Sequence, residues 1–79
     1  MATVRCIVHG GLIASEKIVE IKTVEGSEEV PVPTKQIHGN HLEAPIVGRN
    51  GQRFLIELPR ESSSGRWRIW VNRSQITSS

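Results

Sequence analysis

The chain has 79 residues, of which 37% are hydrophobic and 23% charged, and a formal net charge of +2. A chain of this length forms one small domain (residues 1–79) and buries only about 60% of its surface on folding, which leaves no room for a large catalytic cavity. Its single cysteine excludes an internal disulfide, and no apolar run is long enough to span a membrane or to serve as a signal peptide. We therefore expect a cytoplasmic protein with no membrane contact.

The first half of the chain alternates apolar and polar residues, as strands do. The alternation covers residues 4–8, 18–24 and 30–33, with glycine-containing turns at 10–11 and 25–27. The last of these segments holds two prolines, which predicts an edge strand or a strand that leaves its sheet.

The second half repeats this pattern. Residues 42–46, 54–58 and 67–71 alternate, and the Asn-Gly pair within 49–51 predicts a hairpin turn. The serine-rich segment 60–66 is expected to be a flexible connector, although it could close over a ligand. No window has a helical period, so helix is expected only as short turns.

The two halves resemble each other. Residues 30–37 align with 69–76 without a gap, and both segments end in Gln-Ile. Upstream, 4–8 matches 42–46, and 19–21 matches 54–56. The pattern predicts an internal duplication of residues 1–39 and 40–79.

The predicted fold is all-β. Two pseudo-symmetric three-stranded units would form a small six-stranded barrel, SH3-like or similar, filled by side chains. The expected core residues are the inward members of each alternation and the isoleucine that the short turn after each third strand brings inward. They are Val4, Cys6, Val8, Val19, Ile21, Val30, Val32, Ile37, Leu42, Ala44, Ile46, Phe54, Ile56, Leu58, Trp67, Ile69, Val71 and Ile76.

Positive charge is concentrated in the second half. Residues 40–79 contain six arginines and three glutamates, whereas residues 1–39 contain four basic residues and five glutamates. Alternation in the last strand places Trp67 inward and the Arg66, Arg68 and Trp70 side chains outward on one ridge. An indole can stack on a base while arginines hold phosphates. The predicted ligand-binding residues are Arg66, Arg68, Trp70, Arg73 and Arg53.

Two other interpretations of these residues are open. Trp70 could cover a neighbouring loop or lie in a dimer interface, with the arginines solvated. The equivalent pairs Thr34-Lys35 and Arg73-Ser74 could hold an anion at a turn, although hydroxyls that cap a one-turn helix are the favoured interpretation.

No metal, cofactor or catalytic residue is predicted. Cys6 and His9 have a spacing that zinc ligands use, and so do His38 and His41, but strand alternation points Cys6 inward and His9 away from it. Cys6 is expected to be an inert core thiol. The glutamates of the first half are expected to form a solvated surface, because no pocket is implied that would shift their pKa values.

The segment 69–76, Ile-Trp-Val-Asn-Arg-Ser-Gln-Ile, resembles a Trp-Ile/Val-Pro-Lys/Arg-Ser-Gln-Ile/Val ending of small β-rich proteins encoded by bacteriophages and mobile elements. The match covers about eight residues and departs from the pattern at Asn72, where Pro33 of the first half keeps the proline. The resemblance implies a phage or bacterial origin and a role in handling nucleic acid or in blocking host defence.

The sequence therefore predicts a non-enzymatic binding module for nucleic acid or a nucleotide. The alternative is a protein-interaction module, either an inhibitor of a host defence protein or a homo-oligomer such as a homodimer. Outward Ile7, Ile18, Leu55 and Trp70 would then form the contact.

Overall fold

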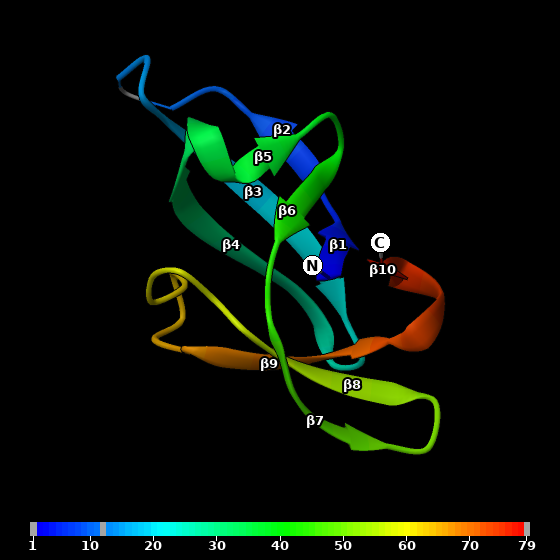
Figure 1. Cartoon of the computed structure of the whole chain (residues 1–79). Coiled ribbons are helices and arrows are strands. Elements are labelled where there is room, and N and C mark those ends of the chain that lie inside the picture. Colours follow the sequence, from blue (N-terminus) through cyan, green and yellow to red (C-terminus); the bar gives the residue numbers. More distant parts are fainter. Residues whose placement is uncertain (1, 12, 79) are drawn as a thin grey trace.

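The computed structural model describes residues 2–11 and 13–78 and is built of antiparallel β-sheets (Figure 1). Helix occurs in these residues only as two short 3₁₀ turns, η1 (Thr34–Gln36) and η2 (Arg73–Gln75). The all-β prediction is confirmed. No helix of the described residues is long and apolar enough to cross a membrane.

Each half of the chain contributes one three-stranded sheet. The first-half sheet has the order β2 (Ile7–His9), β3 (Glu16–Thr23) and β4 (Gly26–Pro33). The second-half sheet has the order β7 (Ile46–Asn50), β8 (Arg53–Glu57) and β9 (Arg68–Asn72). In both sheets, strands that are consecutive in the sequence are neighbours and pair antiparallel.

A four-stranded central sheet joins the two halves. Its order is β10 (Ile76–Ser78), β1 (Ala2–Arg5), β6 (His41–Glu43) and β5 (Ile37–His38). The first strand of each expected unit is interrupted, at Cys6 and at Ala44-Pro45, so that its beginning joins the central sheet and its end joins another. The described residues therefore form three separate sheets, and no single closed six-stranded sheet is found among them.

The same element order occurs twice along the chain. The backbone bonds repeat as well: the amide of Thr34 donates to the carbonyl of Ser15 at 2.9 Å, and that of Arg73 to Gln52 at 2.8 Å. Val19 lies opposite Val30, and Ile56 lies opposite Ile69. This register makes Ile56 the counterpart of Val19, so the expected match of 19–21 with 54–56 is two residues out of step. The duplication itself stays a prediction.

One hydrophobic core lies between the sheets. Every expected core residue except Trp67 is buried or packs half-buried against the others. Trp67 is 55% exposed, and its placement in the core was wrong. The reason is that β9 begins at Arg68, so Trp67 lies in a bend where the alternation of a strand does not apply.

Candidate anion-binding surface

Two of the expected ligand residues lie in a hollow that also holds carboxylates. Arg66 and the half-buried Trp70 line it together with Thr23, Ser27, Ile69 and two glutamates. The Arg66 Nη1 atom lies 3.4 Å from Glu25 Oε1, and Arg66 Nε lies 3.9 Å from Glu28 Oε2. The charge of Arg66 is therefore offset within the protein, and the carboxylates disfavour a phosphate beside Trp70.

The serine-rich segment 60–66 is tied down over this hollow. The buried Ser62 hydroxyl donates to Glu28 Oε1 at 2.8 Å, and Ser64 Oγ donates to the same atom at 2.6 Å. The Arg66 amide donates to Ser62 Oγ, and the Ser63 amide donates to the carbonyl of Glu29. Where a flexible connector was expected, the structure has a loop held by hydrogen bonds, because Ser62 points into the protein.

The same contacts shift the titration of Glu28. The hydrogen bond from Ser64 is the largest cause that lowers the pKa of this carboxyl, and the Ser62 hydroxyl and the Arg66 charge lower it further, while burial acts in the opposite direction. Glu28 is thus held in its ionised form as an anchor for the loop.

Arg68 is also paired. It lies opposite Glu57 on the outer face of the second-half sheet, and its Nε and Nη2 atoms donate to Glu57 Oε2 at 3.2 and 3.1 Å. Trp70 lies opposite Leu55 on the same ladder. The outward direction of the ridge is as expected, but Arg68 has a counter-ion of its own.

A second group of arginines gathers near the end of β9 that leads into η2. Arg49 and Arg73 line a second hollow with Gly51, Phe54 and Ile76. The guanidinium carbon of Arg49 lies 5.1 Å from the centroid of the Phe54 ring, a cation–π distance. The bond from the Arg73 amide to Gln52 fixes η2 against the β7–β8 turn.

Two further arginines border this region. Arg5 donates from Nη2 to the carbonyl of Ser74 at 3.0 Å, and Arg53 begins β8 opposite Asn72, one residue after the turn. We call Arg5, Arg49, Arg53 and Arg73 the basic end. Within the described ranges, no carboxylate lies within 4.0 Å of any of these guanidinium groups. Residues 46–56 and 68–78 contain no acidic residue at all.

The structure therefore divides the predicted site. Arg66 and Trp70 share the hollow with the carboxylates, Arg68 pairs on the outer face, and Arg73 and Arg53 belong to the basic end. Arg49 was missed as a site residue. The hairpin signal could have found it, because a turn at 50–53 places Arg49 opposite Phe54.

The two short 3₁₀ turns are not capped as expected. Their N-cap positions are Pro33 and Asn72, so Thr34 and Ser74 lie inside the turns. The Thr34 hydroxyl instead donates to the carbonyl of Ala14 at 3.2 Å. At η2 the backbone amide of Asn72 donates to Gln75 Oε1 at 3.0 Å, which closes the turn.

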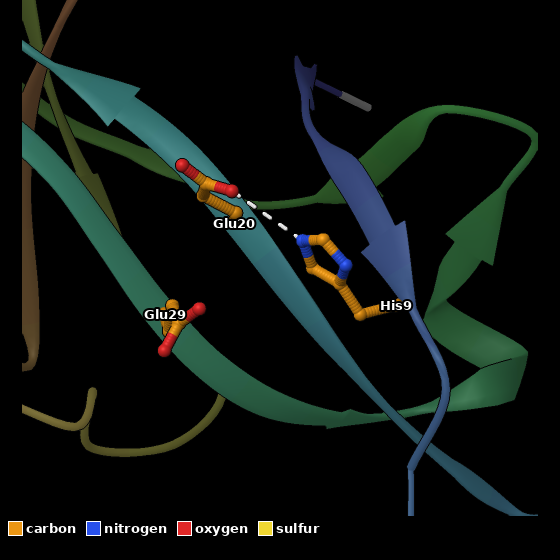
Figure 2. Close-up of side chains that lie close together, drawn as sticks. All are labelled: His9, Glu20 and Glu29. Atoms are coloured by element: carbon orange, nitrogen blue, oxygen red, sulfur yellow. Dashed lines mark hydrogen bonds and ion pairs between the residues drawn. The ribbon is translucent and has the colours of Figure 1, made fainter.

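The zinc-like Cys/His spacing produces no cluster in residues 2–11 and 13–78. Cys6 is buried, and burial raises the pKa of its thiol, as expected for an inert core cysteine. His38 pairs with Glu43 instead. The metal-ligating side chains that do converge are His9, Glu20 and Glu29, which share only His9 with that spacing (Figure 2).

Comparisons of the chain with protein-family models, with curated proteins and with solved structures find no match. The hollow of the basic end is lined by the guanidinium groups of Arg49 and Arg73, the Phe54 ring and the turn backbone at Gly51. Arg5 and Arg53 border the region but do not line this hollow. Guanidinium groups gathered in this way can bind several phosphate oxygens at once.

Proposed function

We propose that this protein is a non-enzymatic binding module for single-stranded nucleic acid, with the basic end as its phosphate-binding surface. The observation that supports the proposal most directly is the absence of carboxylate partners around Arg5, Arg49, Arg53 and Arg73 in the described residues, whereas Arg66 and Arg68 have such partners. Arginines without internal counter-ions attract phosphates and release the ions bound to them.

Trp67 supplies the stacking surface in this proposal. It is the exposed tryptophan, and it precedes β9 just as Arg73 follows it. The five residues of β9 separate them, and the six steps from Trp67 to Arg73 span about 20 Å at about 3.4 Å per residue. A strand of a few nucleotides with its phosphates at the basic end is long enough to reach the indole.

The proposal extends to the fold. Two units, residues 1–39 and 40–79, would form a small SH3-like barrel with a duplicated frame. The shared core and the hydrogen bond from the Val24 amide to the carbonyl of Trp70, which joins the first- and second-half sheets at 3.1 Å, support this arrangement. Slow hydrogen exchange at the Val24 amide is expected.

The test is fluorescence anisotropy of labelled single-stranded DNA and RNA at two salt concentrations. Affinity should fall as salt rises. The double variant Arg49→Gln/Arg73→Gln should bind about tenfold more weakly, with the salt slope reduced by about 2, because two phosphate contacts are removed. Arg60→Gln is the matched control, since Arg60 pairs with Glu16 at 2.9 Å outside the basic end.

Three results would distinguish the possible surfaces. Loss of binding in Trp67→Ala but not in Trp70→Ala supports stacking at the exposed ring. Loss of binding in Arg68→Gln, with no change in the double variant, would place the site on the ridge of Arg66, Arg68 and Trp70 instead. Binding that ignores salt, or no binding to any single strand, overturns the proposal.

A second candidate is a protein-interaction module. Ile7 on β2 and Val47 on β7 are 46% and 43% exposed, and both strands are edges of their sheets. An exposed edge with apolar side chains can pair with a second copy or with a host protein, as the phage resemblance implies. Ile18 and Leu55, also expected in such a contact, are half-buried. Light scattering that shows a monomer over a wide concentration range would exclude the homodimer.

A further inference from the structure

We propose that His9, Glu20 and Glu29 bind a divalent transition-metal ion, with Zn²⁺ as the probe, on the outer face of the first-half sheet. This site does not depend on nucleic-acid binding, and it lies away from the hollow of Arg49 and Arg73, while Glu20 lines another hollow with Arg5. Figure 2 shows the three side chains on three adjacent strands, with the His9 ring directed at Glu20.

The strand register brings the three ligands together. Glu20 lies directly opposite Glu29 across the β3–β4 pair, and His9 lies on β2 diagonal to Glu20. One ligand atom from each residue lies within 4.8 Å of the others, and His9 Nε2 lies 3.3 Å from Glu20 Oε1. Ligand atoms around tetrahedral zinc are about 3.4 Å apart, given bonds of about 2.0–2.2 Å. Side-chain movements of about 1 Å would therefore bring the three ligand atoms to the spacing that zinc requires.

Electrostatics favours a cation at this position. Two carboxylates directly opposite each other across a strand pair destabilise a sheet. No lysine or arginine nitrogen lies within 4.0 Å of either carboxylate in residues 2–11 and 13–78. At the equivalent place in the second-half sheet, Glu57 lies opposite Arg68, and the two form an ion pair. The carboxylates of Glu20 and Glu29 thus have no side-chain cation in the position that Arg68 occupies beside Glu57.

The donor set indicates the class of ion. One imidazole nitrogen and two carboxylate oxygens suit Zn²⁺, whose open sites take three protein ligands and leave a fourth position for water. Mg²⁺ prefers oxygen ligands alone, so the histidine discriminates against it. His9 is 48% exposed, so an ion can enter without opening the fold.

The test is calorimetric titration of the whole chain with ZnCl₂, with MgCl₂ as the comparison ion. We expect one zinc ion per chain, and a loss of affinity of at least tenfold in His9→Ala and in Glu29→Gln. His38→Ala is the matched control, because His38 pairs with Glu43 but joins no third ligand in the described ranges. The control should bind zinc as the native chain does.

A second measurement guards against variants that fold poorly. Glu29→Gln removes a like-charge contact and should fold at least as well as the native chain. In an amide NMR spectrum of the native protein, zinc should shift resonances of β2, β3 and β4 and leave those of Arg49, Arg53 and Arg73 unchanged. Undiminished binding in His9→Ala and Glu29→Gln, loss in His38→Ala, or no saturable binding at all would overturn the proposal.

Discussion

The two halves of the molecule share a frame but differ on their outer faces. Glu20 and Glu57 occupy equivalent positions, yet Glu20 lies opposite Glu29 while Glu57 lies opposite Arg68. The inward positions of both halves are hydrophobic and meet in one core. The core restricts what can point inward, whereas solvent tolerates either charge, so the features that distinguish the halves chemically lie outside. Three of the four arginines of the proposed anion surface accordingly belong to the second half, and the proposed cation site belongs to the first.

The halves also differ in how their longest hairpins are closed. β3 and β4 pair over eight residues and meet at the tight turn after Thr23, where Gly26 has φ 144°. β8 and β9 are instead joined by the serine-rich loop, which needs the Glu28 anchor of the first half. The β8–β9 connection of the second half therefore depends on the charge of Glu28, whereas the β3–β4 turn of the first half does not.

The largest expected effect tests this dependence. Glu28→Gln should lower the free energy of unfolding by about 1–2 kcal/mol at neutral pH, because the charge-assisted hydrogen bonds from Ser62 and Ser64 and the Arg66 interaction are weakened. The pKa of Glu28 is lowered in the folded state, so its contribution is present above about pH 4.5 and is lost as the pH falls through the lowered value.

Urea unfolding between pH 3 and 7 measures this effect. The native chain and Glu28→Gln should converge at the acidic end, and Glu29→Gln serves as the control on the adjacent position. A difference that is constant across the pH range would mean that Glu28 acts by packing and not by its charge.

An intermediate effect is expected at the two equivalent glutamines of η1 and η2. Gln75 accepts from the Asn72 amide and donates to the carbonyl of Lys22 at 2.7 Å. The buried Oε1 atom of Gln36 has no hydrogen-bond donor among the described residues. The reason is that the position before η1 that corresponds to Asn72 is occupied by Pro33, which lacks a backbone N–H.

We therefore expect Gln75→Leu to cost about 1 kcal/mol and Gln36→Leu to be neutral or slightly stabilising. Thermal unfolding of the two variants side by side gives the answer. Equal losses would show that the hydrogen bonds of Gln75 do not distinguish the halves.

The smallest expected effect comes from copying the ion pair of the second half into the first. Glu29→Arg should raise the free energy of unfolding by about 0.5 kcal/mol, since it replaces a cross-strand repulsion with an attraction on an exposed face. The reverse change, Arg68→Glu, should lower it by a similar amount.

High salt should shrink both effects, because the charges are solvent-exposed. Denaturant unfolding at low and high salt measures them. A destabilised Glu29→Arg chain at low salt would contradict the equivalence of Glu29 and Arg68.

Much of the fold follows from alternation. The apolar residues of the strands recur at every second position, and this pattern places fifteen of its sixteen expected core residues in or against the core, to which the short turns add Ile37 and Ile76. Two features depend on the complete chain. The breaks at Cys6 and at Pro45 send each first strand into two sheets, and the start of β9 leaves Trp67 outside, although its position in the alternation predicts an inward side chain.

The site was less predictable for a physical reason. A guanidinium is available to a phosphate only if no carboxylate reaches it first, and the glutamates that reach Arg66 come from the β3–β4 hairpin, about forty residues earlier in the chain. The sequence shows the surplus of arginine but not these pairings. The convergence of His9 with Glu20 and Glu29 likewise depends on the register of three strands.

The central sheet has one further consequence. β1 and β10 pair antiparallel with Ala2 opposite Ser78, so the two ends of the described chain lie next to each other. A short linker could join them without straining the sheet, and the chain could then be opened at the exposed turn after His38, where Gly39 has φ 62°. Such a circular permutant would exchange the order of the two halves while keeping every strand pair.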